Sequence, residues 1–156
     1  MTLKMRVERK GGLLPRVHLS GSIDEHSRLE EVLGAIQEDA TLDLSLIDRI
    51  NSVGLLSWLK WMGVLTKKHR ISVEIISYGL AIYAAQLLDL FGSAKVRSCM
   101  APYYCPSCKT NREVPVGAEE VDASKGAPPV KKCPQCASPM DFDEMDQYFA
   151  FLRTQA

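Results

Sequence analysis

The chain has 156 residues, of which 46% are hydrophobic and 24% are charged, with 19 basic side chains balanced by 19 acidic ones. This apolar content supports a folded core and excludes wholesale disorder, while the balanced charge argues against nucleic-acid binding driven by bulk electrostatics. No run approaches the roughly 20 apolar residues of a spanning helix, and the charged, alternating N-terminus is unlike a secretory signal. We therefore expect a cytoplasmic protein without a membrane span.

Residues 1–100 alternate between strand and helix patterns. Period-2 alternation and β-branched residues predict strands at Leu3–Glu8, Arg16–Ser20, Thr41–Leu46, Ile71–Ser77 and Ala94–Cys99. Apolar residues at helical spacing predict three helices. The first is capped by Ser22 or Asp24 and reaches Ile36, the second covers Ser52–Lys68, and the third covers Gly79–Phe91. This order predicts an α/β fold with a mixed, mostly parallel β-sheet and helices packed against it.

The cysteines indicate a metal site in the second part of the chain. Two C-x-x-C pairs supply four thiols, from Cys105, Cys108, Cys133 and Cys136. Two such pairs can form the tetrahedral sulfur set that zinc prefers, with iron in a rubredoxin-like site as the competing metal. Four protein ligands leave no open position for substrate, so we expect a structural zinc ion.

The remaining cysteine and the histidines stand outside this pattern. Cys99 ends a predicted strand, and we expect it to be a free, buried thiol. His18, His26 and His69 are scattered, so none is assigned as a metal ligand.

Proline content divides the chain near residue 100. Residues 1–100 hold one proline, whereas residues 101–140 hold the other seven of eight. We therefore predict a first domain over 1–100 and a zinc ribbon over 101–140, which at this size needs a metal for stability. Residues 141–156 carry a capping-box-like Asp141 and Glu144 before an apolar stripe, and predict an amphipathic helix that packs back on the first domain. A helix that docks on a partner is the alternative.

The motifs of the first domain resemble the STAS domain, a family that includes bacterial anti-sigma-factor antagonists and the cytoplasmic tails of sulfate transporters. The resemblance covers about residues 3–98, and it is carried by the segments at residues 19–24, 42–45, 51–55 and 87–92. It implies that Ser52 occupies the position of the phosphorylated serine, and that Asp24 and Asp43 match two acidic positions of the family. Asn51 departs from the pattern, because the family has aspartate there. The partner implied by the resemblance is a serine kinase that acts as an anti-sigma factor.

The residues around Ser52 are compatible with a binding surface that is switched by phosphorylation of this serine. Ser52 is expected to cap the helix that follows it, and a helix N-terminus favours added negative charge. A phosphate there would add about −1.5 to −2 charges to a surface that a partner would cover. The alternative interpretation is a plain helix cap that is never modified.

The helix Ser52–Lys68 is apolar beyond the stripe that should face the sheet. Trp61 and Val64 fall on or beside its polar side, together with Lys60 and Lys67. Such residues either contact a partner or a second copy in a homodimer, or are covered by the C-terminal helix.

No nucleophile elbow, phosphate-binding loop or dinucleotide-binding motif is present, so we expect no enzyme. The leading interpretation is a regulatory protein-binding module that uses Asp24, Asn51, Ser52, Trp61 and Val64. One alternative is a structural or scaffolding subunit that docks through its zinc ribbon. Another, less favoured because the ribbon carries little net charge, is a nucleic-acid-binding adaptor that uses ribbon residues Tyr103, Tyr104, Lys109, Arg112, Lys131 and Lys132.

Overall fold

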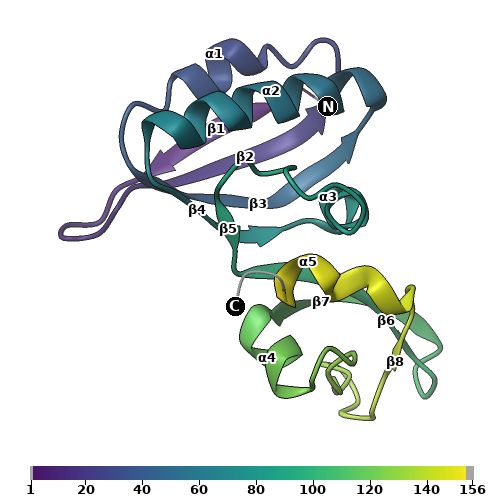
Figure 1. The fold of residues 1–156 in the computed structure, drawn as a ribbon. Helices are drawn as coiled ribbons and strands as arrows, with labels where there is room; N and C mark the ends of the chain where they lie inside the picture. Colours follow the sequence, from purple (N-terminus) through teal and green to yellow (C-terminus); the bar gives the residue numbers. More distant parts are fainter. Residues whose placement is uncertain (1, 154–156) are drawn as a thin grey trace.

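The computed structural model describes residues 2–153 and forms an eight-stranded mixed sheet with five α-helices and a short 3₁₀ helix (Figure 1). The strands are β1 Lys4–Glu8, β2 Arg16–Ile23, β3 Ala40–Ile50, β4 Ile71–Ile76, β5 Lys95–Val96, β6 Ser98–Cys105, β7 Thr110–Gly117 and β8 Asp141–Phe142. The helical segments are α1 Leu29–Gly34, α2 Ser52–Lys68, α3 Tyr78–Ala84, α4 Ala118–Ala123, η1 Asp146–Phe149 and α5 Ala150–Arg153. The predicted α/β class with a mixed sheet is confirmed.

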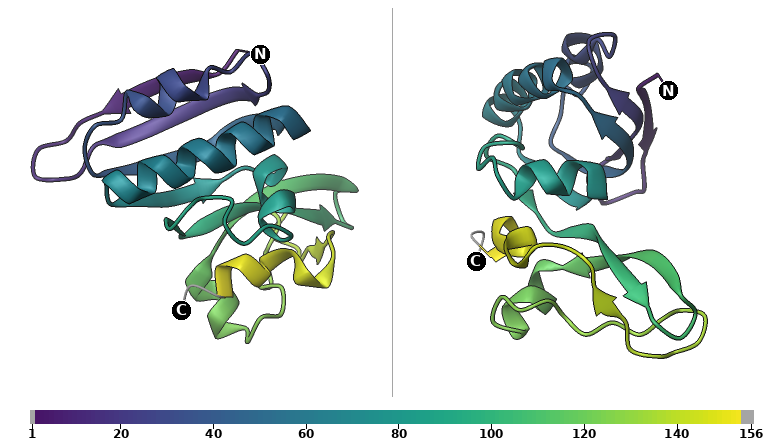
Figure 2. Two further views of the ribbon diagram at one scale, coloured as in Figure 1. Left: turned by 45° about the horizontal axis from the view of Figure 1, so that its top comes forward. Right: turned by 90° about the vertical axis from the view of Figure 1, so that its right-hand side faces the viewer.

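The sheet order follows from two kinds of connection. The strands run β1-β2-β3-β4-β6-β7, with β5 also beside β4 and β8 beside β6. A hairpin makes β1 antiparallel to β2, whereas β2, β3 and β4 are parallel and are joined through α1 and α2. Right-handed crossovers that advance in one direction place their helices on the same face of the sheet. Figures 1 and 2 show α1 and α2 side by side on that face.

The core fills the space between the sheet and these helices. Alternate residues of the central strands point into it, and Leu42, Leu44 and Val73 are fully buried. From α2, Trp58 and Met62 are also fully buried, as the helical spacing predicted. Within residues 2–153, no helix has both the length and the apolar sequence needed to cross a membrane.

Strand β6 runs through the boundary expected at residues 100 and 101. Near its start Cys99 pairs with Ile76 of β4, and over its whole length β6 pairs with β7. One continuous strand therefore belongs both to the main sheet and to the cysteine-containing segment. The division at residue 100 stays a prediction about independent folding.

Two helix starts differ from the sequence-based expectation. Ser22 lies buried inside β2, and the N-cap of α1 is Arg28, in a left-handed conformation with φ 50° and without a side-chain cap. Ser52 is the first residue of α2 and not its cap. The cap is Asn51, whose Oδ1 accepts a hydrogen bond from the Gly54 N–H at 2.8 Å. The prediction failed because β3 continues to Ile50 and brings the chain into the helix one residue earlier.

The predicted helix Gly79–Phe91 is also too long, since α3 ends at Ala84. The chain then turns through Gly92, which has φ 60°. A side chain at this position would lie 2.3 Å from the Thr66 hydroxyl of α2. This close approach to α2 favours a compact turn over further helix. The strand expected at Ala94–Cys99 is correspondingly divided between β5 and β6.

The tail is helical only in its last part, so the prediction of one helix from residue 141 was wrong. Residues 141–142 pair with Tyr103 and Tyr104 as strand β8, and residues 154–156 lie outside the described part. The free edge of β6 offers backbone hydrogen bonds that a helix at 141 would forgo. Glu144 accepts a hydrogen bond from the Tyr78 hydroxyl at 2.5 Å in place of capping a helix.

The end of the described chain joins α3 to β6. The Tyr148 hydroxyl donates to the Met100 carbonyl at 2.6 Å, and the Tyr148 ring lies 6.0 Å from that of Tyr78. Phe149 is buried and stacks on Phe142 at 5.0 Å. The aromatic residues of the tail thus contact α3, β6 and β8.

Two glycines of α2 provide a matched test of this packing. A Cβ at Gly54 would lie 2.3 Å from the Ile23 carbonyl oxygen, whereas one at Gly63 would meet nothing within 4 Å. We expect Gly54→Ala to destabilise the protein by about 2–3 kcal/mol, since backbone must move. Gly63→Ala should stabilise it by about 0.5–1 kcal/mol through helix propensity. Urea unfolding measures both, and equal effects would contradict the close contact of α2 with β2.

Removing one hydroxyl tests how the tail is held. The Glu144 carboxylate raises the pKa of Tyr78 to about 12, because the phenol donates to it. A raised folded-state pKa stabilises the fold fully below the unfolded value of about 10, and this contribution is lost as the pH rises to about 12. We expect Tyr78→Phe to cost about 1 kcal/mol at pH 7 and progressively less above pH 10. A pH-independent difference in unfolding free energy would show that the hydrogen bond is not its source.

Candidate metal centre and docking loop

The four predicted ligands converge at the end of the β6–β7 hairpin. Their sulfurs all lie within 4.8 Å of one another, with Cys105 Sγ 3.5 Å from Cys136 Sγ and Cys108 Sγ 3.9 Å from Cys133 Sγ. In a tetrahedral site with metal–sulfur bonds of about 2.3 Å, neighbouring sulfurs are about 3.8 Å apart. The arrangement is therefore compatible with one metal ion bound by four thiolates.

The two C-x-x-C segments fold as similar turns. The residue after each pair, Lys109 or Ala137, is left-handed, with φ 55° and 62° respectively. The first turn directs the Cys108 N–H toward Cys105 Sγ at 3.3 Å. The second is closed by a hydrogen bond from the Ala137 N–H to the Cys133 carbonyl at 2.8 Å. Local backbone geometry thus gives both C-x-x-C pairs a closed turn of similar shape.

The second turn stabilises the thiolates of its own two cysteines. Backbone N–H groups of Cys136 and Gln135 lower the pKa of Cys133 to about 6. Hydrogen bonding from the Ser138 side chain and N–H lowers the pKa of Cys136 in the same direction. Contact with the Cys136 side chain acts in the other direction at Cys108 and raises its pKa to about 12. Metal binding requires deprotonated sulfur, so a metal ion would have to displace the proton of Cys108.

A further observation supports a metal at this position. Arg112 Nη2 donates to the side chain of Gln135, which lies between Cys133 and Cys136, and its Nε is buried without a hydrogen-bond partner within residues 2–153. Interaction with Cys133 raises the pKa of Arg112. A cation beside four thiols is anomalous, whereas one beside four thiolates and a divalent metal is favourable. When bound, the metal would crosslink β6, β7 and the segment before β8, with no position left for substrate.

Cys99 is separate from this cluster and fully buried in the sheet. Burial raises the pKa of Cys99 to about 12, which keeps it a neutral thiol.

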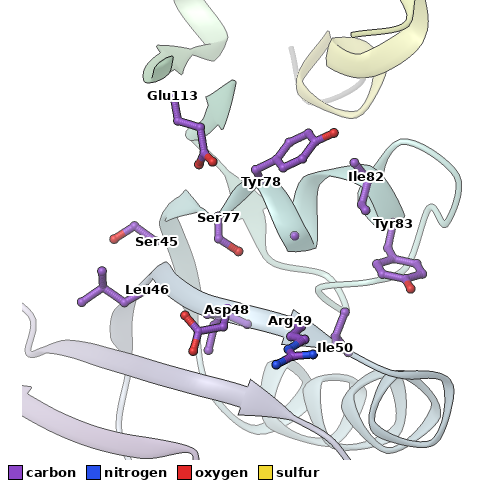
Figure 3. A pocket seen from close by; sticks show the side chains of 12 residues that line it. Ser45, Leu46, Asp48, Arg49, Ile50, Ser77, Tyr78, Ile82, Tyr83 and Glu113 are labelled. Carbon is purple, nitrogen blue, oxygen red and sulfur yellow. The ribbon is translucent and has the colours of Figure 1, made fainter. Parts of the chain in front are cut away.

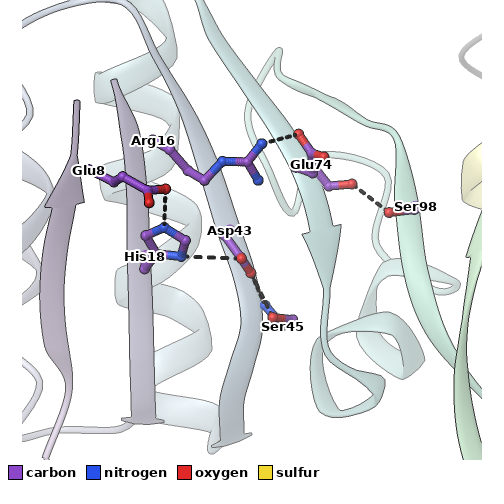
Figure 4. A network of polar contacts seen from close by, with 7 residues as sticks. All are labelled: Glu8, Arg16, His18, Asp43, Ser45, Glu74 and Ser98. Atoms are coloured by element: carbon purple, nitrogen blue, oxygen red, sulfur yellow. Dashed lines mark hydrogen bonds and ion pairs between the residues drawn. The ribbon is translucent and has the colours of Figure 1, made fainter. Parts of the chain in front are cut away.

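Among the histidines, His18 lies on the sheet face opposite the helices, between Glu8 at 3.4 Å and Asp43 at 3.2 Å (Figure 4). This polar network was not predicted, because it depends on the pairing of β1, β2 and β3.

The predicted docking residues Asp24, Asn51 and Ser52 do come together. Adjacent parallel strands end at Ile23 and Ile50, so the loops that follow them lie at one edge of the sheet. Asn51 donates its backbone N–H to the Ile23 carbonyl at 3.1 Å, and Asp24 Oδ1 accepts from the His26 N–H at 2.9 Å.

Trp61 and Val64 lie elsewhere along α2. They are half-buried and line a groove of about 320 Å³ between α1 and α2, which also includes Leu33 and Ile36. The sequence suggested that the C-terminal helix might cover these residues, but it is α1 that lies beside them. The loop and this groove are therefore distinct surfaces.

A depression of about 520 Å³ was missed by the sequence analysis. It lies between the end of β3 and α3, and Figure 3 shows Asp48, Arg49 and Tyr83 around it, with Glu113 of β7 at its margin. Pockets commonly lie at the carboxyl ends of parallel strands. The predicted parallel strands could therefore have indicated this position.

Comparisons with known proteins give little further constraint. No protein-family model matches the chain, and no curated protein matches it. Among solved structures, an uncharacterized protein from the DUF3478 family of Shewanella loihica PV-4, described as having a SpoIIAA-like fold, is similar over 61% of this chain and 83% of that chain. The identity is 17% and the TM-score is 0.38.

Metal removal tests the centre directly. We expect the purified chain to hold one metal ion, measured by elemental analysis, and Cys105→Ser or Cys133→Ser to lose it. A strong chelator should lower the melting temperature, because the β6–β7 hairpin loses its crosslink. Cys99→Ala serves as the control and should keep the metal. A wild-type chain that holds only traces of metal and melts unchanged with chelator would contradict the assignment.

Proposed function

We propose that the chain is a non-enzymatic regulatory module that binds a protein partner through the Asn51–Ser52 loop and the first turns of α2. We further propose that the four cysteines hold a structural zinc ion. The observation that carries the binding proposal is an exposed apolar surface directly after the loop.

That surface consists of Val53 and Leu56, which are 55% and 69% exposed. They lie three residues apart and therefore on one face of α2. The opposite face of the same helix is already committed to the core through Trp58 and Met62. Large apolar side chains that remain in solvent beside a structured loop are typical of a contact surface.

The loop itself is held in one conformation. The Asn51 side chain accepts from the Gly54 N–H and donates to Glu25 Oε2 at 2.7 Å. This contact lowers the pKa of Glu25, so the carboxylate is charged at neutral pH. A pre-organised loop costs little conformational entropy on binding, which supports its use as a docking element.

Ser52 is exposed within this fixed frame. As the first residue of a 17-residue helix, it lies where the helix dipole favours a phosphate. The same phosphate would face a loop that already carries Glu25 and Asp24. We propose that phosphorylation makes the surface strongly negative and releases the partner.

The partner class comes from the resemblance to STAS domains, which implies a serine kinase that acts as an anti-sigma factor. Asn51 keeps the cap geometry that the family's aspartate would supply. It also donates to Glu25, where an aspartate carboxylate would repel it.

The zinc proposal rests on the donor set and its spacing. Four clustered thiolates suit zinc, which commonly binds four sulfur ligands in structural sites. Zinc is also redox-inactive, as expected of a metal with a purely structural role. The metal then stabilises a segment too small to fold on its own core.

The competing functions have weaker support. Two of the ribbon cations proposed for nucleic-acid contacts are engaged within the protein, since Lys131 pairs with Glu120 and Arg112 contacts Gln135. A scaffolding role through the ribbon would have to use surface such as Val130, which is 82% exposed.

Site-specific photo-crosslinking tests the docking surface. We expect a crosslinking amino acid at Leu56 to capture one regulatory kinase-like protein in cells, identified by mass spectrometry. Capture should persist in Ser52→Ala and disappear in Ser52→Asp, because the added charge opposes docking. The control places the same amino acid at Leu88, which is 89% exposed but lies on the turn after α3. Equal capture at both positions, or none at Leu56, would refute the proposed surface.

A further inference from the structure

Arg112 occupies an unusual position in the ribbon. It lies on β7 opposite Tyr103 of β6, and it is half-buried, whereas its neighbours Asn111 and Glu113 are exposed. Strand alternation therefore points this one cation toward the cysteine side of the hairpin.

The guanidinium has few partners other than sulfur. Its Nη2 donates to the Gln135 side chain, which lies between the two cysteines of the second C-x-x-C pair. Its Nε is buried with no hydrogen-bond partner in the described chain. Gln135 places the guanidinium beside the second C-x-x-C pair. Interaction with Cys133 is the larger cause of the raised pKa of Arg112, and Cys108 contributes in the same direction.

Charge balance explains what this contact does. Four thiolates around a divalent ion leave a net charge of −2, which is costly where the ligands are partly buried. The other ribbon cations do not offset it at close range: Lys131 is paired with Glu120, and Lys109 and Lys132 are exposed. A guanidinium beside these sulfurs supplies a positive charge where the thiolate charge develops.

We propose that Arg112 is the positioning residue of the metal centre, which neutralises part of the thiolate charge and thereby slows release of the metal. This inference rests on the metal centre proposed above. It assigns Arg112 to the metal centre. In the nucleic-acid alternative drawn from the sequence, the same residue would have contacted a phosphate. Groups outside the ligand set that hydrogen-bond to ligands commonly change metal affinity by about 10- to 100-fold.

The test compares neutral variants of the full-length chain. Arg112→Gln removes the charge, and Arg112→Met also removes it while keeping the apolar stem, in case the first variant folds poorly. The matched control, Lys132→Gln, removes one positive charge beside Cys133 at an exposed position. Gln135→Ala removes the Nη2 partner and leaves the guanidinium in place.

The first readout is the rate at which zinc passes to a chromophoric chelator. We expect about 10- to 100-fold faster transfer in the two neutral variants. Lys132→Gln and Gln135→Ala should stay within about 2–3-fold of wild type, because the charge at the sulfurs is retained. Unchanged transfer in both neutral variants would overturn the proposal, as would an equal acceleration by Gln135→Ala.

A second readout separates charge from general loosening. In the Co²⁺-loaded chain a nearby cation lowers the energy of the sulfur lone pairs, so its removal should shift the thiolate-to-cobalt charge-transfer bands to longer wavelength. Faster transfer without any band shift would make Arg112 a merely structural residue. A wild-type chain without thiolate-to-cobalt bands would refute both the metal centre and this inference. Normal bands in the wild-type chain, with the same band position and zinc-transfer rate in the Arg112 variants, would refute the inference alone.

Discussion

Strand β6 is shared by two structures, and this shared use constrains most of the molecule. Near its start Cys99 extends the parallel sheet beside Ile76, and at its end Cys105 is a predicted metal ligand. The hairpin partner β7 and the short strand β8 are positioned by the same strand. Any metal at the cysteines is thereby connected through continuous backbone to the main sheet.

This connection explains why the tail does not form one helix. The edge of β6 beside Tyr103 and Tyr104 would be unpaired without residues 141–142. An exposed sheet edge invites association with other chains, and covering it removes that liability. The aromatic residues that follow then pack where α3 and β6 meet, with Tyr148 bonded to the Met100 carbonyl. The tail thus connects α3 to β6.

At the Asn51–Ser52 loop and at the cysteine cluster, a polar side chain from one segment lies beside groups of another segment. At the loop, the neutral amide of Asn51 accepts from the helix and donates to an anionic Glu25. At the cysteines, a cationic Arg112 lies beside sulfurs that become anionic when metal binds. Both sites place a polar side chain where its charge state matches its neighbours.

Local sequence patterns determined the strand and helix periodicity and the two C-x-x-C turns, because each depends on residues close together in the chain. The order of those elements then indicated the α/β class. The tertiary structure alone decided that Asn51 and not Ser52 caps α2, since the length of β3 depends on its pairing with β2. It also decided that residues 141–142 form a strand, that His18 contacts Glu8 and Asp43, and that the half-buried Arg112 lies on β7 opposite Tyr103. These features come from contacts between segments distant in sequence, whose energies no local pattern records.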